Sequence, residues 1–418
     1  MRVQSSKLQR TIVKNKMTDS LFLCAVQGVN KDVRDKSTLM AIAKFPLVKN
    51  HGLWYYGSER KEGDWIVGAV NDLKSERIEW VDILKGLGIL SVVWGHSGSK
   101  NAFYMFWFHM PLFFFVSGYL YRLKPQQTVL AYAKKKAQHL LIPYLFYLTL
   151  LTLTMMGVSL WKGQTIGYFL QGHWKAFLLG GSLLEGVYAT FWFTTCLFSV
   201  QIAYDYLCRK VPSVFYKGIF LVGCFLLAYG ESRYWMNSFV PWNVDVGLYA
   251  LVFYALGHLI KQYQFLEKAI LRNIIFGLSF LVLLSFIYLY SHQILDYGLD
   301  MKHRQYYYFG TNLILPLVFT LLLIKISMIF TRWPLIKNSL VRLGRAAMVI
   351  MYLHIASVYL VRQFIAITPI RFLVVGIIIP LLIYKIAKHV PYGKSLALGE
   401  VEEGFRPKFP EFPAKKYY

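Results

Sequence analysis

The sequence predicts an all-α fold: a polytopic integral membrane bundle of about ten transmembrane helices with both termini in the cytoplasm. Three observations support this prediction. Hydrophobic residues make up 56% of the 418 residues, above the roughly 45–50% of soluble domains. They gather in segments long enough to cross a bilayer. Lys and Arg collect between alternate segments, as the positive-inside rule expects for cytoplasmic loops.

The spans begin near residue 83 and continue almost to the C-terminus. Their approximate limits are 83–98, 103–121, 140–160, 190–207, 214–230, 246–260, 273–291, 309–330, 346–364 and 370–387. One set of alternate loops carries most of the basic residues, so we expect it in the cytoplasm. The net charge of +25 comes mainly from these loops and the termini. It therefore indicates contact with a lipid bilayer and no binding of nucleic acid.

Outside the spans, two segments differ in composition. Residues 1–75 are basic and aperiodic, and we expect a cytosolic extension of unknown role. Its apolar run LFLCAV is too short for a signal peptide, and 51–67 is a weak candidate for a strand pair. Residues 76–390 form the membrane domain, and 391–418 a charged, flexible tail. The four cysteines show no CxxC pair and no zinc spacing, which favours buried thiols over a metal site.

The stretch 76–123 is the first candidate for a functional site, because both of its apolar segments carry ionisable residues. Lys85 and His96 are eleven residues apart, so a helix places them on nearly the same face, about 16 Å from each other. His109 begins the second segment just before Met110 and Pro111, at a depth similar to that of His96. Such residues are costly in lipid and usually face a protein interior or a wet cavity.

Several motifs in this order resemble the membrane-bound acyltransferase 3 family. The first two are KGLGILSVVWGH and FHMPLFFFVSGYLY, and later stretches are ATFWFTTCLF, PWNVDVGLYALVFYALGHLIK and LVRLGRAAMVIMYLHI. The third of these five is similar to the WF helix of the family, and the fourth to its fucose 4-O-acetylase-like branch. The resemblance covers about 76–390. It implies an O-acetyltransferase of the cell membrane that takes acetyl-CoA as donor, a carbohydrate as acceptor and no bound cofactor.

Histidine suits removal of a proton from a sugar hydroxyl, because its pKa lies near working pH. The resemblance makes His96 the catalytic base, acting directly or through an acyl-histidine; the alternative is a solvated histidine at a helix end. Lys85 either binds CoA phosphates, pairs with Asp82 or anchors the helix at the interface. Arginine at this family position would offer a bidentate fork, which lysine cannot. His109 is a third catalytic candidate, or a structural histidine bonded to a neighbouring carbonyl.

The remaining candidates are substrate contacts on later segments. The inner loop KKKAQHLLIPY resembles a basic cluster of the family, with His139 where arginine is common. Its lysines either bind CoA phosphates or only orient the chain; they are Lys134, Lys135 and Lys136.

Three further residues have two interpretations each. Ser117, beside Gly118, is a candidate substrate contact, although close helix packing also explains it. Asp245 either binds sugar hydroxyls or stabilises a helix N-terminus. His354 lines the cavity or is a satisfied core histidine.

Two other function classes remain open at this point. A transporter or flippase for a lipid-linked glycan would also need buried Lys and His and helices broken near Pro111 and Pro316. A structural membrane scaffold would tolerate replacement of Lys85 and His96. Several aromatic residues also have two interpretations, sugar stacking or the interfacial belt; they are Trp174, Trp192, Tyr234, Trp235 and Tyr306–Tyr308.

Overall fold

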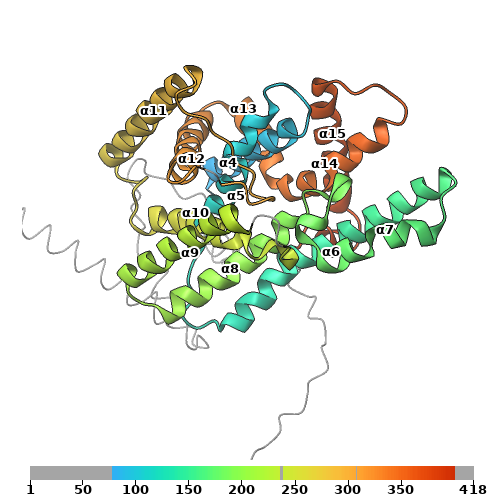
Figure 1. The fold of residues 1–418 in the computed structure, drawn as a ribbon, viewed down its shortest axis with the longest axis horizontal. Coiled ribbons are helices and arrows are strands. Elements are labelled where there is room, and N and C mark those ends of the chain that lie inside the picture. Colours follow the sequence, from blue (N-terminus) through green and yellow to red (C-terminus); the bar gives the residue numbers. More distant parts are fainter. Residues whose placement is uncertain (1–77, 236–238, 307, 401–418) are drawn as a thin grey trace, which may run out of the picture. The chain divides into compact units, whose positions relative to one another are not determined.

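The computed structural model describes residues 78–235, 239–306 and 308–400. All described residues belong to one compact unit, which falls within Arg77–Tyr418 (Figure 1). The strand pair expected at 51–67 lies outside the described residues. Within those residues the structure is helical, and the only strand-like pairing is one isolated bridge between Asp300 and Gln305.

Thirteen α-helices and four short 3-10 helices make up the described part of the chain. The α-helices are α4 (Glu79–Gly95), α5 (His109–Tyr119), α6 (Val129–Trp161), α7 (Ile166–Leu179), α8 (Trp192–Lys210), α9 (Val214–Tyr234), α10 (Val246–Gln262), α11 (Ala269–Ser291), α12 (Thr311–Phe330), α13 (Pro334–Arg345), α14 (Ala347–Val361), α15 (Pro369–Ala387) and α16 (Gly393–Leu396). The 3-10 helices are η1 (Ala102–Trp107), η2 (Gly181–Leu183), η3 (Gly186–Tyr188) and η4 (Pro241–Asn243).

Seven helical segments of the described chain are long and apolar enough to cross a membrane, and the pair α13 and α14, bent by 77°, would make an eighth. The predicted count of about ten spans is therefore not confirmed. The difference lies mainly in the first two segments, because α4 has 17 residues and α5 has 11. The apolar run at 103–121 is divided between η1 and α5, so its length overstates the length of the helix.

The short helices α4 and α5 lie at the centre of the helical unit. Figure 1 shows α4 and α5 between α11–α12 on one side and α14–α15 on the other. Ten of the eleven residues of α5 are buried, which is the pattern of a helix enclosed by protein on all sides. Because its neighbours face the lipid, such a helix does not need to be as long as the bilayer is thick.

Glycines allow these central helices to approach their neighbours closely. A Cβ atom at Gly118 of α5 would lie 1.8 Å from the carbonyl oxygen of Tyr254 in α10. A Cβ at Gly344 of α13 would lie 1.9 Å from the carbonyl oxygen of Asp82 in α4. Both distances are impossible for a real side chain, so these contacts require glycine. This close packing fixes the positions of α4 and α5.

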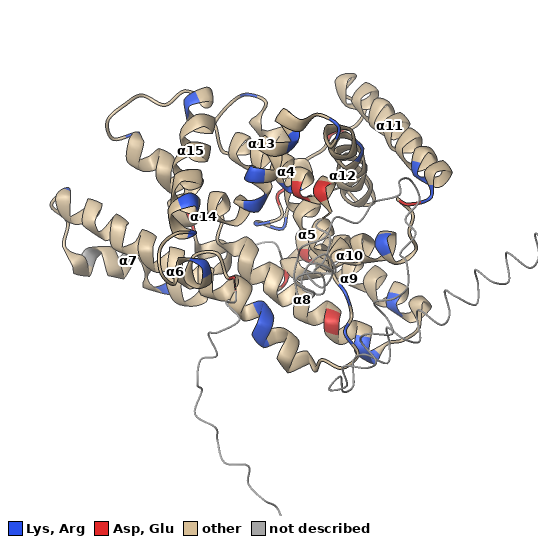
Figure 2. Ribbon diagram, turned by 180° about the vertical axis from the view of Figure 1, so that it is seen from behind, with Lys and Arg blue, Asp and Glu red and all other residues tan. Residues whose placement is uncertain are grey.

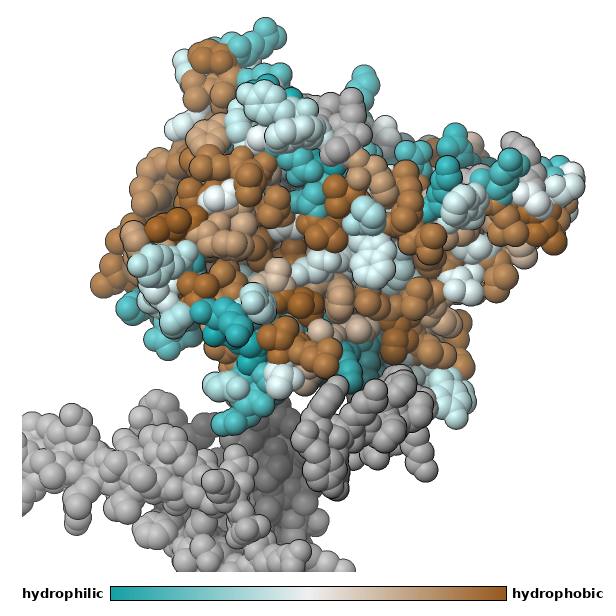
Figure 3. Space-filling view, turned by 60° about the horizontal axis from the view of Figure 1, so that its bottom comes forward, coloured by the Kyte–Doolittle hydropathy of each residue, from teal (hydrophilic) through white to brown (hydrophobic). Residues whose placement is uncertain are grey.

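The surface agrees with a membrane-embedded protein. Figure 3 shows hydrophobic residues over much of one face, with hydrophilic residues concentrated towards its edges. In Figure 2, most Lys and Arg lie at helix ends or in loops. The peripheral helices α11 and α15 bury only 17% of their most apolar windows, as expected of helices that face lipid.

The first part of the expected C-terminal tail belongs to the described structure. Residues 393–396 form α16, and Ala397 is buried. The imidazole of His139 in α6 is hydrogen-bonded through Nδ1 to the carbonyl oxygen of Gly399. His139, which stands where the family commonly has arginine, thus holds this segment against α6.

Candidate functional site

A cavity of about 220 Å³ lies at the C-terminal end of α4. Five parts of the chain enclose it: the end of α4, η1 with the start of α5, the start of α8, the α11–α12 loop and α14. The lining residues are Val92, His96, Phe106, His109, Met110, Ala189, Thr190, Trp192, Asp300, Met301, Lys302, His303 and Met351. Three histidines and one lysine in so small a space give the cavity groups that can bind, donate or accept protons.

His96 lies where α4 ends. Its backbone N–H bonds to the carbonyl of Val92, and the positive φ of Gly98 then turns the chain away from the helix axis. The half-buried imidazole contacts the ring of Phe106 edge-on, with centroids 5.4 Å apart. The end of α4 therefore presents the ring to the cavity and does not leave it in solvent.

His109 faces the same cavity from the first turn of α5. It is 2% exposed, and its Nδ1 is hydrogen-bonded to the carbonyl oxygen of Met105. A carbonyl only accepts, so Nδ1 carries the proton and Nε2 remains an acceptor. The ring of Phe106 lies 5.1 Å from that of His109 and also contacts His96. The two histidines therefore line the same cavity.

His354 lies behind His96 and does not line the cavity. Its ring is fully buried in α14, with a centroid 5.2 Å from that of His96. Nδ1 donates to the carbonyl oxygens of Ile350, at 2.9 Å, and Met351, at 3.1 Å. His354 therefore does not line the cavity itself, but it contacts His96, which does.

The α11–α12 loop covers the cavity as a roof, which we define as residues 299–305. Lys302 donates from Nζ to the carbonyl oxygen of Leu184, at 2.7 Å, and its own carbonyl accepts from Asn243 Nδ2, at 2.9 Å. Burial lowers the pKa of Lys302, and the nearby carboxylates of Glu185 and Asp300 offset this only in part. The lysine therefore joins the roof to the segment before α8 while its stem lines the cavity.

The other charged residues of the roof are also paired. His303 Nδ1 lies 2.7 Å from Asp300 Oδ2. Burial raises the pKa of Asp300, but the hydrogen bonds and charge of His303 outweigh this effect and leave the pKa below its ordinary value. The next residue, Arg304, contacts Asp245 at 2.6 Å and Glu231 at 3.4 Å. These pairs attach the roof to α9 and α10.

Lys85 lies in the N-terminal half of α4, outside the cavity. Its Nζ is 3.4 Å from Asp82 Oδ1, and the other oxygen of Asp82 is 3.7 Å from Arg345 Nε. Glu79 pairs with Lys337 of α13 at 3.2 Å. The predicted pairing of Lys85 with Asp82 is confirmed. The structure thus places the lysine in the N-terminal half of α4 and His96 at its C-terminal end.

Comparison with known proteins decides the family. The family model of the acyltransferase domain matches residues 78–384. The chain belongs to the acyltransferase 3 family. Neither the comparison with characterised proteins nor that with solved structures finds a match. The family makes this chain a membrane acyltransferase.

The other predicted substrate contacts of the acyltransferase are not at the cavity. Lys134 and Lys135 are exposed on the first turns of α6. Lys136 is half-buried, with Nζ 5.3 Å from the centroid of the Tyr132 ring. Ser117 is half-buried in α5 and does not line the cavity.

The position of Asp245 explains why it is not at the cavity. It directly precedes α10, where a negative charge is favourable, but its carboxylate pairs with Arg304 and makes no side-chain cap. The carboxylate of Asp245 thus supports the roof, and its contact with a sugar stays a prediction. Of the proposed stacking aromatics, Trp192 lines the cavity, whereas Trp174, Tyr234 and Trp235 are exposed and fit the interfacial belt.

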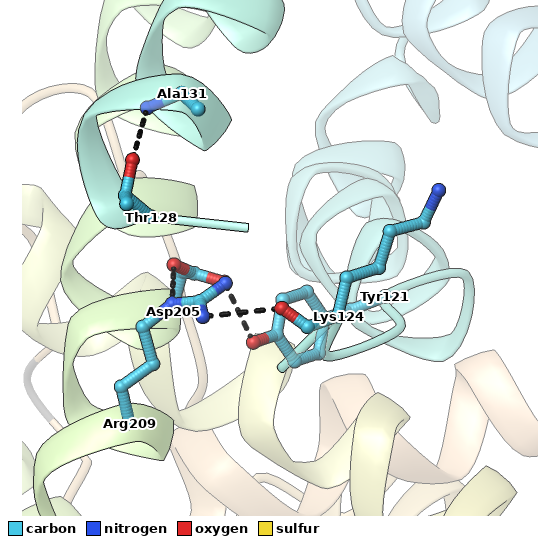
Figure 4. A network of polar contacts seen from close by, with 6 residues as sticks. All are labelled: Tyr121, Lys124, Thr128, Ala131, Asp205 and Arg209. Atoms are coloured by element: carbon cyan, nitrogen blue, oxygen red, sulfur yellow. Dashed lines mark hydrogen bonds and ion pairs between the residues drawn. The ribbon is translucent and has the colours of Figure 1, made fainter. Parts of the chain in front are cut away.

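A buried polar network that sequence reasoning missed lies at the other end of α8 (Figure 4). Asp205 is fully buried and accepts hydrogen bonds from Tyr121 Oη, at 2.9 Å, and Arg209 Nε, at 2.6 Å. Arg209 also donates to the carbonyl oxygen of Lys124, at 3.2 Å. Thr128 caps the start of α6 by accepting from Ala131 N. The network ties the segment after α5 to α8 and so fixes the start of α6.

The roof residues Asp300, Lys302 and His303 were also not assigned to the site from sequence. The available signal was a loop of two Asp, two His and an Arg between apolar segments, which is unusual for a plain connection. Among the residues that the structure describes, no group of three or more His, Cys, Asp or Glu is placed to hold a metal ion.

Proposed function

We propose that this acyltransferase moves an acetyl group from cytoplasmic acetyl-CoA to a sugar hydroxyl of a cell-surface polysaccharide or glycolipid in the cell membrane. The observation that carries the proposal is the shared cavity of His96 and His109. The motif histidine of the family resemblance lies on an enclosed space with a second histidine, a threonine and a tryptophan beside it. The reaction needs a base that takes the hydroxyl proton, and it needs lining side chains that position the sugar ring.

The reaction in this cavity has two steps. The acceptor hydroxyl oxygen attacks the thioester carbonyl carbon while its proton passes to His96. The tetrahedral adduct then expels CoA thiolate, which takes the proton from His96. In a route through acetyl-His96 the imidazole is the nucleophile: it attacks the thioester and CoA leaves as thiolate. The sugar hydroxyl then attacks the acetyl carbonyl, the bond between acetyl and His96 breaks, and the hydroxyl proton passes by way of the freed imidazole to the thiolate. In both routes a negative charge develops on the thioester carbonyl oxygen, and a hydrogen-bond donor at the cavity must stabilise it.

The donor would enter from the opposite end of α4. With both termini in the cytoplasm, Lys85 and the basic start of α6 lie on the cytoplasmic side, where CoA phosphates arrive. Lys134 and Lys135 are exposed there, and Arg345 and Lys337 add further positive charge. The pantetheine arm would then carry the thioester between the helices, past Ser117, to the cavity.

The test compares labelled acetyl transfer in membranes that contain wild type, His96→Gln or His389→Gln at matched expression. His389 is an exposed histidine beyond α15 and serves as the matched control. We expect His96→Gln to lower glycan labelling by about 10²–10⁴-fold, the usual contribution of a general base, while His389→Gln labels like wild type. Equal labelling by all three would remove His96 from the mechanism. Movement of glycan without label in any of them would favour a flippase.

A further inference from the structure

His354 presents an unused hydrogen-bond acceptor towards His96. Its Nδ1–H donates to two carbonyl oxygens of its own helix, so its Nε2 carries a lone pair and no proton. Among the described residues, Nε2 is buried and has no hydrogen-bond partner. Buried polar atoms of this kind are rare, because the group loses water and gains nothing in return. The exception calls for a donor, and the nearest ring is that of His96.

The two imidazoles are at the right separation for such a bond. Their centroids are 5.2 Å apart and their planes are inclined by 44°. Two imidazole rings joined by a hydrogen bond of ordinary length have centroids about 5 Å apart. Rotation of the His96 ring about its Cβ–Cγ bond, which is a soft torsion, is enough to aim a ring N–H at His354 Nε2.

His354 cannot withdraw from this position. It lies in the middle of α14, and a Cβ atom at Gly376 of α15 would be only 3.3 Å from the His354 Cβ. Both of its flanks are therefore occupied: by backbone carbonyls at Nδ1 and by α15 behind Cβ. A fixed acceptor beside a half-buried, rotatable histidine is the arrangement by which catalytic histidines are oriented.

We propose that His354 is a positioning residue that accepts a hydrogen bond from His96. The bond selects the tautomer of His96 whose other nitrogen is unprotonated and faces the cavity. When His96 takes the substrate proton, the bond to His354 becomes charge-assisted and therefore stronger. A neutral histidine thus fills the place that a carboxylate has in a Ser-His-Asp triad. The effect of His354 on catalysis rests on the proposed function, whereas the hydrogen bond between the two histidines does not.

Two variants separate this role from packing. His354→Gln keeps an acceptor oxygen near the position of Nε2, whereas His354→Met has similar length and no strong acceptor. We expect His354→Met to lower kcat about 10- to 100-fold with an unchanged KM for acetyl-CoA, and His354→Gln to restore most of kcat. Equal losses in both variants would show a packing role and overturn the proposal. Wild-type rates in both would overturn it as well.

A second readout does not depend on acetyl transfer. Diethyl pyrocarbonate modifies unprotonated imidazole nitrogen, and peptide mass spectrometry gives its rate at His96 in detergent-purified, folded protein. We expect His96 to react several-fold more slowly in His354→Met than in wild type or His354→Gln, with His389 unaffected in all three. If this order holds but wild type transfers no acetyl, the proposed function fails and the histidine pair stands. If transfer occurs but His96 reacts equally in all three, the pair fails and the function stands.

Discussion

The two ends of α4 use ionisable residues in opposite ways. At the Lys85 end, each charge has an opposite charge as partner: Lys85 and Arg345 share Asp82, and Glu79 pairs with Lys337. At the His96 end, His96, His109 and His354 contact other rings, and the two whose imidazoles are hydrogen-bonded, His109 and His354, bond to backbone carbonyls. His96 and His109 line the cavity, and His354 lies beside it. Paired charges stabilise and orient helices, whereas nitrogens left free at a cavity can act on a substrate. The comparison therefore supports the proposal that the chemistry takes place at the His96 end and that the Lys85 end anchors the helix and admits the donor.

The largest effect we predict is a loss of stability caused by a substitution in the central helix α5. Gly118→Val places a branched side chain where even a Cβ would lie 1.8 Å from the Tyr254 carbonyl oxygen. The helices α5 and α10 must then separate, and we expect a loss of more than about 3 kcal/mol of stability. Detergent-solubilised protein should be aggregated on gel filtration. The neighbouring Ser117→Val is the control, and equal behaviour of the two would show that α5 and α10 are not in close contact.

The next effect is a loss of stability in the Asp205 network that leaves the reaction rate unchanged. Asp205→Ala leaves Arg209 without its buried carboxylate and removes the acceptor of Tyr121. We expect about 3 kcal/mol of destabilisation, because breaking a buried pair strands the partner. Tyr121→Phe should cost about 1 kcal/mol. Thermal unfolding followed by fluorescence gives both values. The rate per folded molecule should stay unchanged, and a large fall in that rate for the mild Tyr121→Phe variant would give this network a role in the reaction.

A smaller effect is expected at the roof. Lys302→Met removes the donor to the Leu184 carbonyl but keeps the length of the stem. Loss of one such bond corresponds to about 1 kcal/mol, so we expect a several-fold rise in KM for the acceptor and faster hydrogen exchange in residues 299–305. Lys175→Met, on the exposed surface of α7, is the control. Unchanged exchange in the roof would mean that Lys302 does not hold it.

The sequence was sufficient for those parts of the site that depend on local spacing. His96 and His109 lie close together because a short turn joins α4 to η1 and α5, and a hairpin of this length can be recognised from its apolar segments. The basic start of α6 and the pairing of Lys85 with Asp82 also follow from local pattern.

The parts that could not be predicted depend on tertiary packing. His354 reaches His96 only because α14 packs against α4, and no local pattern in α14 encodes that contact. The roof was visible as a polar loop, but its place over the cavity depends on the contacts of Lys302 and Arg304 with distant segments. The span count was not confirmed for a related reason: apolar length cannot distinguish a helix in lipid from one enclosed by protein, such as α5.

The most direct test of the account compares the two ends of α4 in one assay. Acetyl-transfer kinetics would be measured for His96→Gln and Lys85→Met in the same membranes, with both substrates varied. The account predicts a fall in kcat of about 10²–10⁴-fold for His96→Gln. For Lys85→Met it predicts an unchanged kcat and at most a raised KM for acetyl-CoA. An equal loss of kcat in both variants would contradict it, because the chemistry would then need both ends of the helix.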